Sequence, residues 1–181
     1  MNIGLIIGSL REKSYNTKLA SHITQAFSDV TFERISIGEL PFFNEDLETN
    51  GDPQAVQQFK TAVERMDGLI ILTPEYNGSI PGVLKNALDW GSRPVTNSVF
   101  HNKQVGIIGA TPGGMGTAFA QIHLRQVLEA MRADVLPHEK LHVSRVHELC
   151  AVAEQPNTFR YVDRYVQQFI HFIQNTKGVH V

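Results

Sequence analysis

The sequence predicts a three-layer α/β sandwich, in which a five-stranded parallel sheet of order 2-1-3-4-5 is covered by helices on both faces. Short apolar runs rich in Ile and Val alternate with longer segments that carry an apolar residue every three or four positions. The length of 181 residues is also enough for one such structure with its own core. These two observations together favour the doubly wound α/β class.

The predicted strands are continuous apolar runs. Strands that face water on one side alternate apolar and polar residues, whereas strands covered on both faces are apolar throughout. The pattern therefore favours a buried, parallel sheet. The runs are Asn2–Gly8, Thr31–Ile37, Gly68–Thr73, Gln104–Ala110 and a shorter one around Leu141–Val143.

Between these runs, apolar residues recur at the spacing of helices with one buried face. Asp52 is the expected N-cap of the second helix, with Pro53 in its first turn. A further helix is expected around Lys85–Asp89. The remaining apolar stripes are Leu19, Ile23 and Phe27; Val56, Phe59, Val63 and Met66; Ala120, Leu124, Val127, Leu128 and Met131; and Phe159, Val162, Val166, Phe169 and Ile173.

The alternation of strands and helices favours right-handed crossovers. The order 2-1-3-4-5 is that of flavodoxin, so a flavodoxin-like fold is expected. No linker, repeat or low-complexity segment divides the chain, and residues 1–181 are expected to form a single domain. The long connection Gly38–Asp52 either covers the sheet edge with Phe42 and Phe43 or borders a ligand cleft or subunit contact.

Composition narrows the function classes. The net charge of −2 lacks the basic excess of a nucleic-acid-binding protein, and no run approaches the ~20 apolar residues of a membrane span. The single cysteine, Cys150, excludes an internal disulfide, so a cytoplasmic protein without nucleic-acid or membrane partners is expected. His138-Glu139 followed by His142 is not the H-E-x-x-H zinc signature, and no metal site is expected.

The loop after the first strand carries the donors of an anion site. Ser9, Ser14 and Asn16 supply neutral donors, and Arg11 supplies a fork that can hold two phosphate oxygens. Exposed N–H groups at the start of the next helix would add to them. A helix cap with solvated charges is the alternative interpretation. The loop has neither the P-loop nor the Rossmann glycine pattern, which favours a monophosphate.

Two further loops are expected at the same edge of the sheet. Pro74 and Pro81 stiffen the segment after the third strand. Tyr76 and Asn77 in that segment offer an aromatic wall and an amide to a flat ring, although a rigid turn in which Tyr76 only packs is the alternative. After the fourth strand, the glycine-rich segment Gly109–Thr117 allows the backbone to approach a ligand closely.

These loops contain three longer motifs. They are G-S-L-R-x-x-S-x-N at Gly8–Asn16, T-P-E-Y-N-x-S-I-P-G-x-L-K-N-A-L-D-W at Thr73–Trp90, and H-L-R-Q-V-L at His123–Leu128. Through them the sequence resembles the NADPH-dependent FMN reductase family, which includes bacterial quinone, chromate and azo reductases. The resemblance runs from the first strand to the fourth helix. It implies FMN as the bound cofactor and NADPH or NADH as the hydride donor.

The resemblance also implies roles for individual residues in a flavin site. Gly78 departs from close relatives, which often carry Tyr at this position, and the change should open space over the flavin. The residues implied are Ser9, Arg11, Ser14, Asn16 and the nearby Tyr15 for the FMN phosphate; Pro74, Glu75, Tyr76, Asn77 and Gly78 for the isoalloxazine ring; and Thr111, Gly113 and Thr117 for its pyrimidine side.

By the same resemblance, the protein would be an FMN-dependent NAD(P)H oxidoreductase that reduces quinones or similar small acceptors, such as azo and nitro compounds, chromate or free flavin. One site shared by donor and acceptor implies ping-pong hydride transfer without a catalytic side chain. Family members are usually homodimers, often paired into homotetramers. A flavodoxin-type electron carrier and a flavin-dependent regulatory binding protein are the alternatives, and the net charge of only −2 argues against the carrier.

Overall fold

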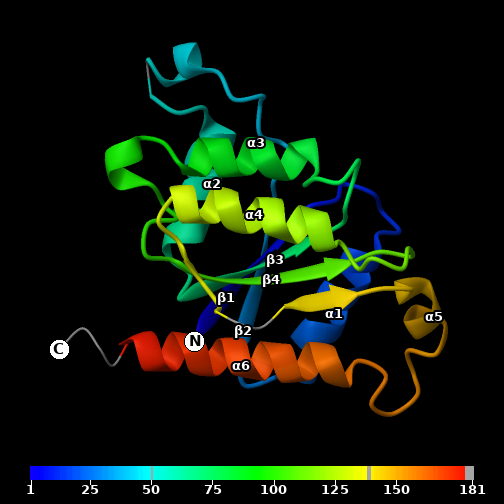
Figure 1. The fold of residues 1–181 in the computed structure, drawn as a ribbon. Helices are drawn as coiled ribbons and strands as arrows, with labels where there is room; N and C mark the ends of the chain where they lie inside the picture. The colour runs from blue at the N-terminus through cyan, green and yellow to red at the C-terminus, as the bar shows by residue number, and fades with distance from the viewer. Residues whose placement is uncertain (50, 138–139, 178–181) are drawn as a thin grey trace.

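The computed structural model describes residues 1–49, 51–137 and 140–177 (Figure 1). A six-stranded parallel sheet runs in the order β2-β1-β3-β4-β5, and β6 also pairs with β4. The predicted order 2-1-3-4-5 is therefore confirmed, and the fold is flavodoxin-like. The strands are β1 (Asn2–Ile7), β2 (Thr31–Ile35), β3 (Gly68–Thr73), β4 (Gln104–Ala110), β5 (Asp134–Val135) and β6 (Leu141–Val143).

Helices cover both faces of the sheet (Figure 1). One face is covered by α2 (Gln54–Glu64), α3 (Gly82–Gly91) and α4 (Ala118–Ala130). The other face is covered by α1 (Tyr15–Ala26), α5 (Val146–Ala151) and α6 (Arg160–Lys177). Two short 3-10 helices, η1 (Glu45–Glu48) and η2 (Val95–Asn97), lie in connections. The four predicted stripes fall on α1, α2, α4 and α6, apart from one residue of each that lies just outside the helix: Phe27, Met66, Met131 and Phe159.

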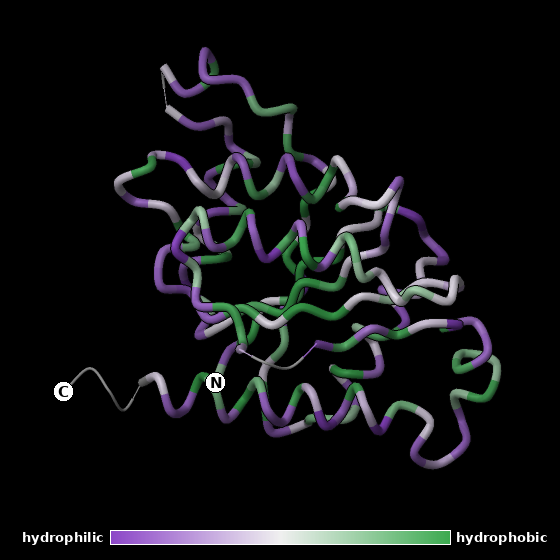
Figure 2. Tube along the Cα trace, viewed as in Figure 1, coloured by the Kyte–Doolittle hydropathy of each residue, from purple (hydrophilic) through white to green (hydrophobic). Residues whose placement is uncertain are grey.

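β3 shows why the strands are apolar throughout. All of its residues are buried. Leu69 and Ile71 contribute to the core under α2, α3 and α4, whereas Ile70 and Leu72 contribute to the core under α1 and α6. Each side chain of this size stabilises the fold by about 1.5–3 kcal/mol when it leaves water. Figure 2 shows hydrophobic residues along the central strands, and hydrophilic residues alternating with hydrophobic ones along the helices around them.

The fifth strand differs from the prediction, because two short strands share its position. β5 pairs with the first residues of β4, and β6 pairs with the last ones. Only the second of them, Leu141–Val143, was expected from the sequence. Pro137 lies between the two strands and has no backbone N–H to donate to a neighbour, which explains the interruption. β5 has only two residues, too few for a periodic signal.

A side chain of α6 bonds to β4 where the fifth strand is interrupted. The hydroxyl of Tyr165 accepts a hydrogen bond from the backbone N–H of Ile107 at 2.7 Å, and Tyr165 itself is buried. Ile107 lies between the residues of β4 that pair with β5 and those that pair with β6. The helix is therefore hydrogen-bonded to the sheet as well as packed on it.

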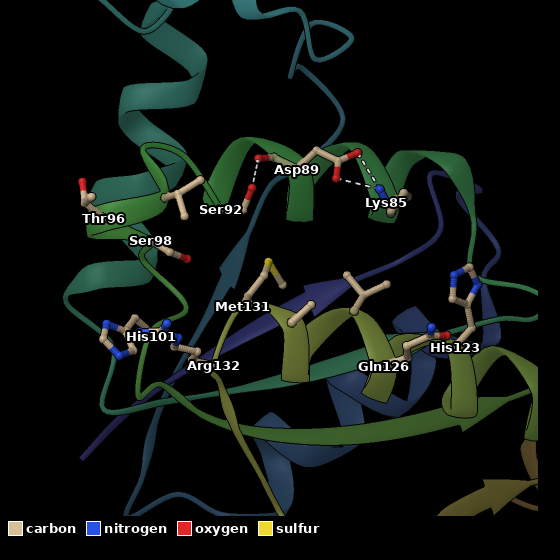
Figure 3. Close-up of a pocket in the computed structure, with 13 residues that line it drawn as sticks. Lys85, Asp89, Ser92, Thr96, Ser98, His101, His123, Gln126, Met131 and Arg132 are labelled. Carbon is tan, nitrogen blue, oxygen red and sulfur yellow. Dashed lines mark hydrogen bonds and ion pairs between the residues drawn. The ribbon is translucent and has the colours of Figure 1, made fainter.

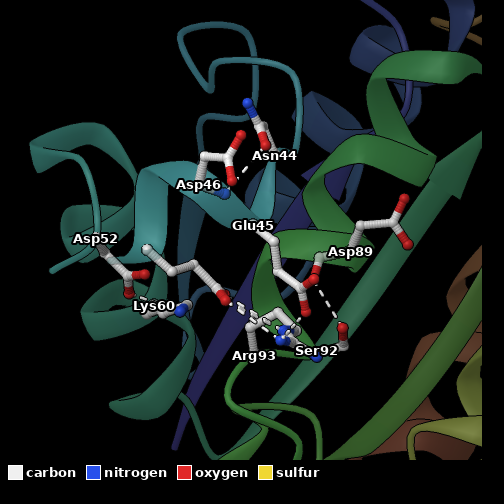
Figure 4. A network of polar contacts seen from close by, with 9 residues as sticks. Asn44, Glu45, Asp46, Asp52, Lys60, Asp89, Ser92 and Arg93 are labelled. Atoms are coloured by element: carbon white, nitrogen blue, oxygen red, sulfur yellow. Dashed lines mark hydrogen bonds and ion pairs between the residues drawn. The ribbon is translucent and has the colours of Figure 1, made fainter. Parts of the chain in front are cut away.

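The start of α2 differs by one residue from the expectation. Pro53, not Asp52, is the N-cap residue. The Asp52 carboxylate instead accepts a hydrogen bond from Lys60 Nζ at 2.6 Å (Figure 4). Because the Lys60 side chain is only 11% exposed, its charge needs a partner at close range. The prediction that Asp52 caps this helix was therefore wrong.

The connection 38–53 is attached to α3 by side-chain hydrogen bonds. Asn86 accepts from the Phe43 N–H at 2.7 Å and donates to the Pro41 carbonyl at 2.9 Å. Trp90 Nε1 donates to the same carbonyl at 2.7 Å. The Trp90 ring is fully buried and meets the Phe43 ring edge-on, with 5.0 Å between their centroids. Two conspicuous residues of α3 thus serve to hold this connection.

The aromatic residues of the connection do not cover the sheet edge, contrary to one of the two expectations. Phe43 packs on α3, and Phe42 is 87% exposed. Arg93, which follows α3, forms ion pairs with Glu45 and Glu48 of η1 (Figure 4). The connection is therefore bonded to α3 and to the residue Arg93 after it, and at its end to α2 through Asp52.

Replacing Tyr165 by Phe should lower the free energy of unfolding by about 1–3 kcal/mol, because the buried Ile107 N–H loses its acceptor. Tyr161→Phe is the matched control, since Tyr161 lies on the same helix but is 62% exposed, so water can replace its hydroxyl. Urea denaturation measures both variants. Equal stabilities of the two would contradict the role given to Tyr165.

Candidate functional site

Three loops meet at the carboxyl ends of β1, β3 and β4, which are neighbours in the sheet (Figure 1). These loops are residues 8–14, 74–81 and 111–117, and we call the edge that they form the rim. The Gly8 N–H donates to the Leu72 carbonyl at 2.8 Å, and Asn16 Nδ2 donates to the Ala110 carbonyl at 3.2 Å. The predicted convergence of the three loops is therefore seen in the structure.

The first rim loop presents hydrogen-bond donors at the start of α1. Ser14 is the N-cap residue, yet its side chain makes no capping bond and is buried. The first backbone N–H groups of a helix have no partner within it, so this helix start carries partial positive charge. The Ser9 hydroxyl accepts from the Arg11 N–H at 3.4 Å. That contact leaves the hydroxyl proton of Ser9 available to a ligand.

Positive charge gathers around Tyr15 at the same loop. Arg11 is exposed, and its guanidinium carbon lies 5.7 Å from the centroid of the Tyr15 ring. The ammonium group of Lys18 lies at the same distance of 5.7 Å from that centroid. One N–H group of Arg11 donates to the Lys13 carbonyl at 3.1 Å, which orients the guanidinium. The loop is thus suited to an anion.

The side chain of Asn16 is already engaged within the protein. The residue is only 2% exposed, and its Nδ2 group is bonded to the Ala110 carbonyl. Its Oδ1 atom has no hydrogen-bond partner among the described residues. An amide oxygen can only accept, so it cannot bind a phosphate oxygen. The side chain therefore joins α1 to β4, and the donors of Asn16 that remain for an anion are its backbone N–H and the second N–H of its amide.

The second rim loop makes a tight turn. Tyr76 and Ser79 exchange both backbone hydrogen bonds at 3.0 Å, and Asn77 and Gly78 between them have φ angles of 53° and 72°. Two positive φ angles are typical of a type I′ turn, for which Asn-Gly is the preferred pair. Tyr76 is 52% exposed, and a Cβ on Gly78 would meet no atom within 4 Å. The turn presents an aromatic side chain beside open space.

Two side-chain hydrogen bonds attach this loop to α4. Glu75 Oε2 accepts from the backbone N–H of Ala120 at 3.0 Å, in the first turn of the helix, where a negative charge is favourable. Ser79 Oγ lies 2.7 Å from His123 Nδ1. The Glu75 carboxylate is therefore engaged within the protein. The bond to His123 could not be anticipated, because nothing local in the sequence links these two positions.

The third rim loop contains open backbone and one inward-facing side chain. Gly113 is exposed, and its N–H donates to Thr111 Oγ1 at 3.2 Å. Gly116 has a φ of 61°, and a Cβ there would lie 2.6 Å from His142 Cβ, so only glycine fits. Thr117 is fully buried and accepts from Gln121 Nε2 at 3.3 Å. This placement does not fit the expected contact between the Thr117 side chain and a ligand.

The resemblance implies FMN as the cofactor, and the rim offers suitable groups to both its phosphate and its ring. Hydroxyl groups, a guanidinium and a free helix start lie together at the first loop, and this donor set suits a phosphate. The half-exposed ring of Tyr76 and the exposed backbone at Gly113 suit a flat ring system with polar edges. The residues present therefore fit a singly phosphorylated flavin.

Outside the rim, the titratable side chains of the described residues form neither a metal site nor a reactive thiol. No group of three or more His, Cys, Asp or Glu there could hold a metal ion, and His138 and Glu139 lie outside the described residues. Burial raises the pKa of the Cys150 thiol, which disfavours the reactive thiolate. Among the described helices, none is long and apolar enough to cross a membrane.

A groove of about 700 Å³ runs between α3 and α4, beside the rim (Figure 3). Lys85 and Asp89 form an ion pair at 2.7 Å on its α3 side. His123 and Met131 line its α4 side, and His123 also bonds to the second rim loop. The groove is built from separate segments of the chain, so no local motif in the sequence indicates it.

Known proteins resemble this chain over nearly its whole length. A family model described as NADPH-dependent FMN reductase matches residues 1–148, which include all three rim loops. A 2-hydroxy-1,4-benzoquinone reductase from a Burkholderia species is 35% identical over 98% of this chain and 98% of its own. An NAD(P)H-dependent FMN reductase from Pseudomonas aeruginosa is 44% identical over 76% of this chain and 74% of its own.

A solved structure supports the same relationship. FerB, a flavoenzyme NAD(P)H:(acceptor) oxidoreductase from Paracoccus denitrificans, is similar with a TM-score of 0.78 and 29% identity. The similarity covers 94% of this chain and 97% of that one. Motifs, fold and relatives agree. The chain therefore belongs to the NADPH-dependent FMN reductase family.

Proposed function

We propose that this protein is an FMN-dependent oxidoreductase that uses NADPH or NADH to reduce quinones or similar small acceptors. The observation that carries the proposal is the meeting, at one rim, of an anion-binding loop and an aromatic turn. Relatives named as a benzoquinone reductase and as an FMN reductase support quinones and free flavin as acceptors. Because both relatives are named as reductases, they favour an enzyme, and not an electron carrier or a regulatory binding protein.

In this proposal, the loop after β1 binds the FMN phosphate. The Arg11 fork and the hydroxyls of Ser9 and Ser14 donate from side chains. The backbone N–H groups of Tyr15 and Asn16, at the start of α1, donate from the helix. All of these groups donate hydrogen bonds, so they can bind the negatively charged phosphate directly, without a metal ion between them.

The flavin ring would lie between the other two rim loops. Residues 74–78 line one edge, with the exposed ring of Tyr76 as its aromatic wall. Residues 111–113 line the pyrimidine side with exposed backbone. We assign Glu75 and Thr117 to support, because the carboxylate of Glu75 bonds to α4 and the hydroxyl of Thr117 is buried. Glu75 attaches the second rim loop to α4, and Thr117 bonds to Gln121 within the first turns of α4.

Bound FMN would supply the redox chemistry, accepting hydride from NAD(P)H and passing reducing equivalents to the acceptor. The protein would hold the flavin, the donor and the acceptor in position within rigid loops. The space beside Tyr76 and Gly78 is open to solvent on one side, which supports one site visited in turn by donor and acceptor. Such alternation gives ping-pong kinetics. No rim side chain is assigned as a nucleophile or general base.

We infer that residues 1–181 work as one domain, because both apolar cores lie against the same sheet. We further infer that the protein acts in the cytoplasm. A single cysteine suits a reducing compartment, and reduced nicotinamide cofactors are used there as donors. Retention of the whole enzyme in a cytosolic fraction would test this location.

Replacing Arg11 by Ala should weaken FMN binding by about 10- to 150-fold, since a charge-assisted contact of ~1.5–3 kcal/mol is lost. Lys13→Ala is the control, because it removes a positive charge from the same loop without removing the fork. Quenching of FMN fluorescence on titration measures both affinities. Equal affinities for the two variants would contradict the phosphate assignment.

We also propose that the protein self-associates as a homodimer, alone or within a homotetramer, through the α3–α4 groove. Lys85 and Asp89 carry opposite charges one turn apart, so this surface can complement a second copy about a twofold axis. Apolar side chains extend the surface along α4, where Phe119 and Ile122 are 54% and 61% exposed. A second copy would remove them from water.

Ile122→Asp should convert the assembly to a monomer, because an interfacial apolar contact becomes a buried, unpaired charge. Tyr161→Asp, at an equally exposed position of α6, should leave the assembly intact. Size-exclusion chromatography with light scattering gives the mass of each. A wild-type monomer, or an Ile122→Asp variant with unchanged mass, would contradict the assignment.

A further inference from the structure

A serine and a histidine far apart in the chain meet at the inner side of the rim. Ser79 Oγ and His123 Nδ1 are 2.7 Å apart, although the two residues are 44 positions apart in sequence. Ser79 closes the tight turn that begins at Tyr76. His123 lies on α4, and Figure 3 shows its imidazole at the end of the groove nearest this loop.

The turn has little other support from side chains. Its tip, Asn77-Gly78, projects into open space, since a Cβ on Gly78 would meet no atom within 4 Å. Tyr76 is 52% exposed. On the other side of the turn, Glu75 is bonded to the Ala120 N–H of the same helix. The aromatic wall is therefore held between two bonds to α4, one of them through His123.

We propose that His123 is a positioning residue for the ring end of the flavin site, acting through Ser79. This inference rests on the proposed function, because it concerns the loop that would line the isoalloxazine ring. The hydrogen bond fixes the end of the turn relative to α4. It also sets the direction of the Ser79 hydroxyl proton, and so decides whether this proton is available at the rim.

The direction of the bond depends on the tautomer of His123. An imidazole with Nδ1 unprotonated accepts from the Ser79 hydroxyl, and the serine proton is used. An imidazole that carries a proton on Nδ1 donates to Ser79 Oγ, which frees the serine proton for a ligand acceptor. Lys85 and Asp89 of α3 line the same groove but pair with each other at 2.7 Å.

A double-mutant cycle tests the positioning role with FMN as the probe. Ser79→Ala and His123→Leu should each raise the dissociation constant by about 2- to 10-fold, as expected for one hydrogen bond. The double variant should be no weaker than either single variant, because the same bond is lost. His123→Asn should restore affinity, because its amide can replace Nδ1. Gln126→Ala, one turn farther along the same groove, is the control.

Unchanged affinity in both single variants, or additive losses in the double variant, would overturn the inference while leaving the proposed function intact. A wild-type protein that fails to bind FMN would instead overturn both. Equal weakening by Gln126→Ala would show that the groove, and not the bond to Ser79, is responsible. That result also overturns the positioning role.

Discussion

The rest of the structure depends on one constraint, which is that the parallel sheet is covered on both faces. Its central strands are apolar along nearly their whole length, so polar groups can gather only where the strands end. β1 leads to α1 on one face, whereas β3 leads to α3 on the other. The two connections diverge, and a crevice opens between them. The position of the site is therefore a consequence of the topology.

Polar side chains at the rim divide into two groups according to burial. Asn16 and Thr117 are buried and bond to neighbouring elements, and Glu75 bonds to the start of α4. Arg11 and Tyr76 are exposed and face the solvent. A binding site needs both groups, because a ligand is oriented only as well as the loops that hold it. Residues of a single motif thus share the work of support and contact.

Local patterns predicted most of the fold and the place of the site. Apolar runs located the four long strands, and serine, arginine and glycine in loops after them indicated the rim. β5 was not predicted because two residues carry no period. The burial of the Asn16 side chain was not predicted, because its partner Ala110 lies 94 positions away. Thr117 is also buried, although its partner Gln121 is only four positions away. The type of a residue alone does not show whether its side chain contacts a ligand or supports the loop that does.

The bond between Tyr165 and Ile107 has a consequence for how the chain is made. β4 receives a partner for this N–H only from α6, the last helix in the described chain. During synthesis, the sheet emerges from the ribosome well before that helix does. For this interval one N–H group of β4, that of Ile107 between the positions of β5 and β6, lacks its acceptor. The arrival of α6 therefore completes the hydrogen bonding of a strand that lies inside the sheet.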